Sequence, residues 1–155
     1  MWGAFKGYFL WLHYLNHGTS DGIVVERHVD LLFRDEQGRE CTEENLGGPY
    51  VVLDFWTTSC GICFKKFPLL EKTFIEGQKS GKVKVYAVNS PLERDSANQA
   101  INIIKKLNYT FPVLVASHST LSKLDIRGYP TVFVLNANGN IIYQGNLEGI
   151  GSVIK

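Results

Sequence analysis

The sequence is poor in cysteine, in net charge and in long apolar runs, and each shortage excludes a class of protein. Only three of the 155 residues are cysteine, too few for a small fold built on disulfides. The formal net charge is +1, so no strong field draws nucleic acid or an anionic membrane to the chain. No stretch reaches the ~20 apolar residues needed to span a bilayer. Internal repeats and low-complexity segments are also absent from the sequence.

What is present is typical of one globular domain with a real core. Hydrophobic residues make up 45% of the chain and charged residues 20%, a balance typical of soluble globular proteins. A chain of this length is expected to fold as a single domain. It can then bury roughly 70% of the surface that its unfolded form exposes.

The first residues form an aromatic-rich segment that differs from the rest. Residues 2–15 place apolar side chains at near-helical spacing, which predicts a helix. Lysine and histidine residues interrupt the apolar run, so it is a poor match to a signal peptide. The glycine-containing run 16–22 predicts a break. We therefore expect a helical N-terminal extension over residues 1–27 and a main domain over residues 28–155.

Strand and helix patterns alternate along the main domain. A small hairpin is expected at 29–41, and the β-branched and aromatic run 50–56 predicts a strand buried on both faces. Because strands and helices alternate, we expect an α/β fold in which helices cover both faces of a sheet. The other expected elements are helices at 61–79, 94–107 and 120–126, strands at 82–89 and 111–116, a hairpin at 130–145 around Asn138-Gly139, and a last helix from about residue 147.

The stretch DFWTTSCGICFKKFP, residues 54–68, contains the chemistry of this sequence. A C-x-x-C motif near a βαβ pattern indicates a thioredoxin-like redox motif. Cys60 falls where a buried strand ends and a helix begins, and the start of a helix has unpaired N–H groups and a partial positive charge. Both stabilise a thiolate, which is the attacking species in disulfide exchange. Cys63 lies one turn further along and is expected to be less exposed.

The residues around the pair resemble thioredoxin-fold thiol–disulfide oxidoreductases, most of all the TlpA/ResA-like branch. The run 54–56 is similar to the strand before the family's motif, and Pro68 to its helix-kinking proline. The segment 128–139 resembles the family's cis-proline segment, and 30–55 resembles the N-terminal hairpin added in this branch. The resemblance covers residues 29–148. It implies a thioredoxin-like three-layer α/β/α sandwich with a mixed central sheet and an added N-terminal β-hairpin.

The resemblance implies catalytic roles for three residues. Cys60 would be the attacking nucleophile, and Cys63 would be the resolving thiol that attacks the mixed disulfide. Asp54 would be a buried carboxylate that accepts the proton of Cys63. Burial raises the pKa of an acid, which suits a base that works near neutral pH.

The resemblance also implies a substrate-binding segment. Pro130, if its peptide bond is cis, would face the disulfide and take the backbone of the substrate as an extra strand. Tyr129 precedes it in the same segment, and Trp56 would shield the floor of the active site. Read without the resemblance, Pro130 also fits the plain start of a strand, and an acid such as Asp54 also fits a strand edge.

Other interpretations of the motif stay open at this point. A zinc site would need two further ligands, and the sequence has no second C-x-x-C. A purely structural bridge would close so short a loop that it removes little chain entropy. Thr57, three residues before Cys60, makes a thiol peroxidase the alternative enzyme class, and a redox-inert binding or metal-delivery module is the non-enzymatic alternative. Lys65 and Lys66 are expected on a solvated face of the helix.

The sequence therefore predicts an enzyme, a protein thiol–disulfide oxidoreductase that reduces client disulfides with its Cys-Gly-Ile-Cys dithiol. No metal or organic cofactor is expected, because the two sulfurs hold the electrons. The expected partners are protein disulfides and dithiols and, by analogy with the family, an electron donor at the membrane. Neither nucleic acid nor a second copy is expected to bind. The resemblance implies an extracytoplasmic, periplasmic location, with a membrane tether possible in a full-length form.

Overall fold

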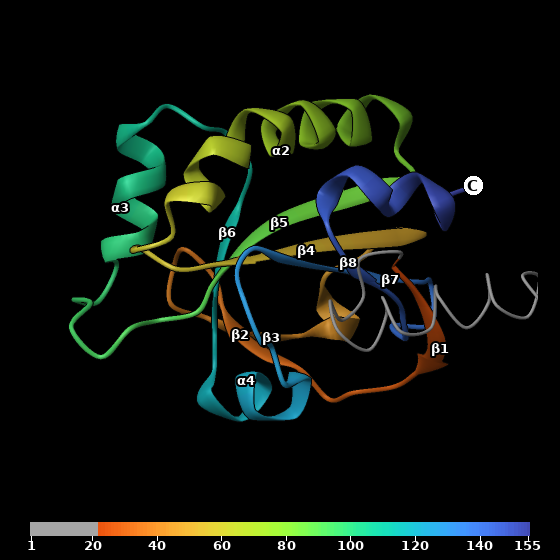
Figure 1. The fold of residues 1–155 in the computed structure, drawn as a ribbon, viewed down its shortest axis with the longest axis horizontal. Coiled ribbons are helices and arrows are strands. Elements are labelled where there is room, and N and C mark those ends of the chain that lie inside the picture. Colours follow the sequence, from red (N-terminus) through yellow and green to blue (C-terminus); the bar gives the residue numbers. More distant parts are fainter. Residues whose placement is uncertain (1–21) are drawn as a thin grey trace, which may run out of the picture.

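An eight-stranded mixed sheet runs through the centre of the structure, a computed structural model that describes residues 22–155 (Figure 1). The strand order is β1-β8-β7-β4-β5-β6-β2-β3. The three strands β4 (Tyr50–Trp56), β5 (Val83–Asn89) and β6 (Val113–Ala116) are parallel, and every other pairing is antiparallel. The helix expected at 2–15 lies outside the described residues.

Helices cover both faces of this sheet and make three layers. On one face, α2 (Gly61–Ser80) and α3 (Gln99–Lys106) pack together with the short 3₁₀ helix η2 (Leu147–Ser152). On the opposite face, α4 (His118–Leu124) packs on the sheet below β2 and β3 (Figure 1). The thioredoxin-like α/β/α sandwich expected from the sequence is therefore confirmed.

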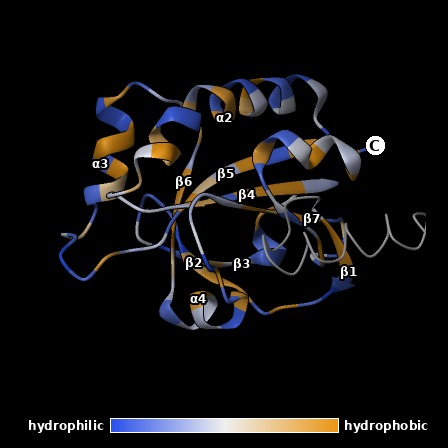
Figure 2. Ribbon diagram, in the orientation of Figure 1, coloured by the Kyte–Doolittle hydropathy of each residue, from blue (hydrophilic) through white to orange (hydrophobic). Residues whose placement is uncertain are grey.

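Strand β4 is the central element of the core. Its odd-numbered residues Val51, Leu53 and Phe55 belong to the apolar cluster on the α4 face, whereas Val52 and Trp56 belong to the cluster on the α2 face. Figure 2 shows hydrophobic residues along β4 and β5. A strand buried on both faces reads as an unbroken apolar run, and this explains why the sequence predicted it well.

The two edges of the sheet come from the N-terminal part of the described chain. The expected hairpin is β2 (Leu32–Arg34) with β3 (Glu40–Thr42), and it extends the sheet beyond β6. At the other edge, β1 (Ile23–Arg27) pairs with β8 (Ile141–Gly145). Residues 23–27 were expected in the extension, and they instead form a strand of the domain's own sheet.

Several helices begin or end at residues other than those predicted, for local reasons. The helix predicted from residue 94 begins only at Gln99, because Asn98 adopts the left-handed conformation with φ 66°. Helix α4 begins before the predicted position, since Ser117 Oγ accepts the N–H of Thr120 and caps it, and it ends at the left-handed Asp125. The hairpin of β7 (Thr131–Leu135) and β8 forms as expected, but its turn is not centred on Asn138-Gly139: the Gly139 N–H donates to the Asn136 carbonyl, and Gly139 takes the left-handed conformation with φ 79°. None of the helices described is both long and apolar enough to cross a membrane.

Candidate active site

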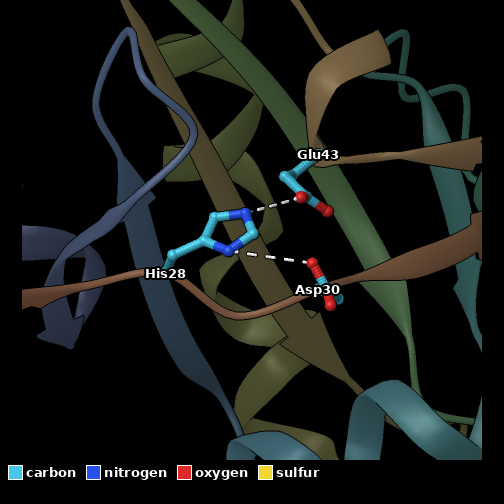
Figure 3. A group of neighbouring side chains, drawn as sticks. All are labelled: His28, Asp30 and Glu43. Carbon is cyan, nitrogen blue, oxygen red and sulfur yellow. Dashed lines mark hydrogen bonds and ion pairs between the residues drawn. The ribbon is translucent and has the colours of Figure 1, made fainter.

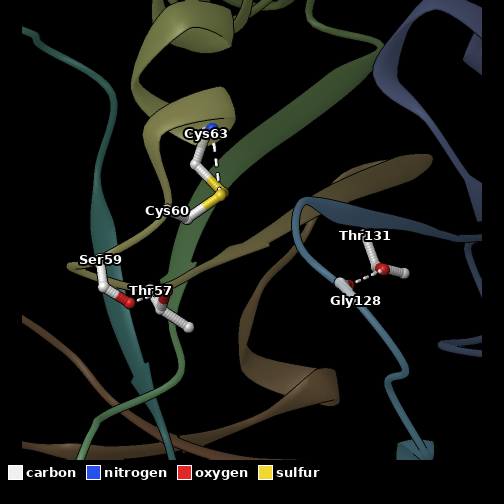
Figure 4. The surroundings of a disulfide bond; sticks show 6 residues. All are labelled: Thr57, Ser59, Cys60, Cys63, Gly128 and Thr131. Carbon is white, nitrogen blue, oxygen red and sulfur yellow. Dashed lines mark hydrogen bonds between the residues drawn. A yellow bond between two sulfur atoms is a disulfide. The ribbon is translucent and has the colours of Figure 1, made fainter.

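The cysteine pair lies where β4 gives way to α2. Cys60 is the N-cap residue of α2 and has an extended backbone, and its Sγ accepts the backbone N–H of Cys63 at 3.1 Å. The two sulfurs are joined in a disulfide (Figure 4). Cys60 is partly exposed, whereas Cys63 is only 1% exposed. An incoming disulfide can therefore reach Cys60 and not Cys63.

The position of Cys60 favours the thiolate once the disulfide is reduced. The first turn of a helix carries unpaired N–H groups and about half a positive charge. The Cys63 N–H bond to Cys60 Sγ shows that one of these donors already points at the sulfur. Because a thiolate is a better acceptor than a thiol, the helix start stabilises the form that attacks disulfides.

Asp54 lies in β4 on the same face as the cysteine pair. Strand residues alternate between faces, so Asp54 shares the α2 face with Val52 and Trp56. These two residues belong to the apolar cluster that contains Cys63. The side chain is buried, with a relative exposure of 2% for the residue. Burial raises the pKa of its carboxyl from 3.8 to about 7; Lys66 opposes this rise and Glu148 adds to it. A carboxyl with that pKa can exchange a proton near neutral pH.

The segment 128–131 lies across from the disulfide (Figure 4). The Tyr129–Pro130 peptide bond is cis, and the Thr131 hydroxyl donates to the carbonyl of Gly128 at 2.6 Å. Thr131 is paired with Phe55 in the β4–β7 ladder, which places Pro130 beside the carboxyl end of β4. The chain segment named by the resemblance is thus next to the motif.

Trp56 closes the interior behind the cysteine pair. Its ring is fully buried and makes edge-to-face contacts with Phe64 and Phe67 at centroid distances of 5.7 and 5.2 Å. Phe67 in turn contacts Tyr109 at 5.7 Å. Such contacts each stabilise the fold beyond the area that they bury, by about 0.5–1.5 kcal/mol. The aromatic group holds the first two turns of α2, and with them Cys63, against the sheet.

Two features of the site were not apparent from the sequence. Lys66 was expected on a solvated face, but it is only 27% exposed and forms an ion pair with Glu148 at 3.0 Å. The loop before Cys60 is tied to the chain after β5, because Thr58 Oγ1 donates to Asp95 Oδ1 at 2.8 Å. No local signal marks either pair, since the partners lie 82 and 37 residues apart in the chain.

A second cluster of polar side chains lies between β1 and η1 (Glu43–Asn45), shown in Figure 3. His28 Nε2 and Glu43 Oε2 are 2.9 Å apart, and His28 Nδ1 is 3.7 Å from Asp30 Oδ1. The other oxygen of Glu43 accepts the backbone N–H of Leu31 at 2.8 Å. Among residues 22–155 this is the group whose atoms lie close enough to surround a metal ion. The bonds of the buried Glu43 carboxylate show that it fastens the β1–β2 connection to η1.

Two proteins of Bacillus subtilis are similar to this chain in sequence. The thioredoxin-like protein YneN of Bacillus subtilis is 26% identical over 137 residues, 87% of this chain and 79% of YneN. ResA of B. subtilis, a thiol-disulfide oxidoreductase by name, is 27% identical over 73% of this chain, and the match spans 62% of ResA. These matches confirm the resemblance to ResA-like proteins inferred from the sequence.

Solved structures agree with the fold. StoA of B. subtilis superposes with a TM-score of 0.60 and 26% identity over 81% of this chain and 96% of StoA. The exposed lipoprotein thioredoxin Etrx1 of Streptococcus pneumoniae gives a TM-score of 0.66 at 25% identity over 81% of this chain and 98% of Etrx1. The model of the AhpC/TSA family matches residues 25–144, which contain every strand from β2 to β7 and both cysteines of the motif. The chain therefore belongs to the AhpC/TSA family.

Proposed function

We propose that this chain is a protein thiol–disulfide oxidoreductase that works through Cys60 and Cys63. The observation that carries the proposal is the placement of the pair: a partly exposed Cys60 at the start of α2, joined to a buried Cys63 on the sheet face that contains Asp54. The relatives named thiol-disulfide oxidoreductase support the same activity.

In the first step, the Cys60 thiolate of the reduced chain attacks one sulfur of a client disulfide. A bond forms between Cys60 Sγ and that client sulfur, and the client's second sulfur leaves as a thiolate. The product is a mixed disulfide between chain and client. Exposure of Cys60 and burial of Cys63 explain why the first cysteine, rather than the second, makes this attack.

In the second step, Asp54 accepts the proton of the Cys63 thiol, and the Cys63 thiolate attacks Cys60 Sγ. The mixed disulfide breaks, the client leaves with both sulfurs reduced, and the Cys60–Cys63 disulfide forms. Two electrons pass from the chain to the client, and the structure corresponds to the oxidised product of this step. A reductant must return two electrons before the next cycle.

The segment around Pro130 is proposed to bind the client. Pro130 and Tyr129 precede β7 beside the carboxyl end of β4. They belong to the segment between Gly128 and Thr131, which lies across from the cysteine pair (Figure 4). A client strand laid along this segment would bring its disulfide to Cys60. Trp56 would contribute indirectly, because its contacts with Phe64 and Phe67 keep the first turns of α2 in place.

The partners and the location follow the same line of argument. The Etrx1 neighbour is described as an exposed lipoprotein. We therefore propose that this chain also acts outside the cytoplasm, as a monomer, and receives electrons from a donor at the membrane. Fractionation of cells that express the full-length protein would check the compartment.

Trapping of the mixed disulfide tests the activity. Cys63→Ser should accumulate a covalent adduct with insulin, whereas Cys60→Ser should form no adduct and should not reduce insulin. Cys41→Ser is the matched control, because Cys41 lies in the β2–β3 hairpin and should leave the insulin reduction rate unchanged. Wild-type reduction by the Cys60→Ser variant would refute the proposal.

A thiol peroxidase is the second candidate, and the family match and Thr57 both favour it. Thr57 lies three residues before Cys60, but its Oγ1 is 3.4 Å from the hydroxyl of Ser59. The joined Cys60–Cys63 pair favours disulfide exchange instead. Reduced wild-type protein should therefore reduce insulin. Its rate of hydrogen peroxide consumption should not exceed that of Cys60→Ser. Rapid peroxide turnover by the wild type would instead favour the thiol peroxidase.

A further inference from the structure

The residues paired with Asp54 in the neighbouring strands offer its carboxyl no opposite charge. Its partners across the ladders of β5 and β7 are Ala87 and Val132, which are apolar. Among the described residues, no hydrogen-bond partner is found for Asp54 Oδ1, although the atom is buried. A buried carboxylate without such partners is costly, so burial raises its pKa, and nearby charges then adjust how readily it ionises.

Two charged groups of opposite sign act on Asp54, and they are bound to each other. Lys66 lies on α2, three residues after Cys63 and so on the same side of that helix. Its Nζ is 3.0 Å from Oε1 of Glu148 on η2. The Lys66 side chain is 27% exposed and that of Glu148 55%. Glu148 therefore offsets part of the positive charge that Lys66 presents to its surroundings.

We propose that the ion pair of Lys66 with Glu148 is a positioning pair that adjusts how readily Asp54 accepts the proton of Cys63. The proposal rests on the proposed base role of Asp54. The positive charge of Lys66 stabilises the Asp54 carboxylate, and the negative charge of Glu148 works against it. The two residues touch neither the client nor the sulfurs in the mechanism; they act through Asp54.

The opposite signs give a test that a structural role cannot imitate. Reduced protein mixed with one equivalent of 5,5′-dithiobis(2-nitrobenzoate) releases one thionitrobenzoate when Cys60 attacks and a second when Cys63 resolves the adduct. The rate of the second release is followed against pH by stopped flow. In the wild type its midpoint is expected near the value of about 7 for Asp54.

Lys66→Met should move the midpoint up by about one pH unit, which slows the second release at pH 6 roughly tenfold. Glu148→Gln should move it down, by less than one unit, because a half-exposed charge is screened by solvent. Lys66→Arg keeps the charge and should keep the wild-type midpoint. Lys65→Met removes the same charge from the exposed neighbouring position and should also leave the midpoint in place.

Lys66→Met and Glu148→Gln both remove the same ion pair. If the pair were merely structural, the two variants should shift the pH midpoint in the same direction or not at all. Either result overturns the proposal, and so does a shift in Lys65→Met as large as that in Lys66→Met. The Asp54→Asn variant distinguishes a wrong role for the Lys66–Glu148 pair from a wrong role for Asp54 in the proposed function. If Asp54→Asn retains the wild-type pH profile, Asp54 is not the base; if it loses the profile while the pair variants leave it unmoved, only the role of the pair is wrong.

Discussion

Replacement of Asp54 by asparagine should stabilise the oxidised protein, and increasingly so as the pH rises. Asp54 is buried in β4, and its carboxyl pKa is about 7 in the folded chain against an ordinary value of 3.8. The folded protein therefore holds a proton that the unfolded protein releases between these two values. The free energy of unfolding that Asp54 contributes is present at low pH and is lost as the pH rises through about 7.

The size of the effect follows from the two pKa values. Between pH 5 and pH 8 the wild type should lose about 2–3 kcal/mol of unfolding free energy through this carboxyl alone. Asparagine has no such titration, so the difference between variant and wild type should grow by the same amount over this range. The absolute gain will be smaller, because the buried amide has its own desolvation cost of about 1–3 kcal/mol.

Urea denaturation of both proteins at pH 5, 6, 7 and 8 measures this difference. The disulfide is kept oxidised so that Cys60 and Cys63 do not titrate. Glu93→Gln is the control, because it makes the corresponding acid-to-amide change at an exposed position. A flat difference for Asp54→Asn would refute the reasoning, since it would mean that Asp54 ionises in the folded chain as readily as in the unfolded one.

Three further predictions concern stability. Phe67→Ala removes the ring at the centre of the aromatic group and should lower the unfolding free energy by about 3–5 kcal/mol in urea denaturation. Gly77→Ala would place a Cβ 2.5 Å from the carbonyl oxygen of Val83, so the melting temperature should fall even though alanine favours helices; Gly81→Asn, at an open left-handed helix end, should change it far less. Burial works to raise the pKa of Glu43, but the hydrogen bonds that it accepts, first from the Leu31 N–H, lower it overall. Its stabilising effect is therefore present above pH 4.5 and lost as the pH falls below that value, so Glu43→Gln should flatten the acid side of the stability curve measured by thermal melts.

Two polar side-chain pairs lie near the cysteine motif and were visible only in the structure. The cysteine spacing and the buried acid are common to the interpretation from sequence and to the structure. The ion pair of Lys66 with Glu148 and the bond between Thr58 and Asp95 are specific contacts of this chain. Thr58 lies two residues before Cys60 and Lys66 three residues after Cys63, so substitutions there would change the rate or pH dependence without removing the reacting sulfurs.

The sequence alone was sufficient for the elements whose signals are local. The run 50–56 is apolar on both faces, and α2 has helical spacing from the first residue after Cys60, so both were located within one residue. The motif Cys60-x-x-Cys63 at their junction identified the chemistry. These features depend on residues close together in the chain, where periodicity and capping are visible without any tertiary contact.

Other features depended on tertiary structure, because their partners are far apart in the chain. The sequence of β1 shows only a weak alternation of apolar and polar residues. The strand is held by its pairing with β8, which lies more than a hundred residues later in the chain. The start of α3 is set by the left-handed Asn98 and not by its apolar spacing. Lys66 meets its partner Glu148 on η2 only in the folded chain, because the two residues lie 82 positions apart. The sequence by itself determined which atoms can react, and only the folded chain decided the burial and the charges that set when Asp54 can take up a proton, because both depend on distances in space.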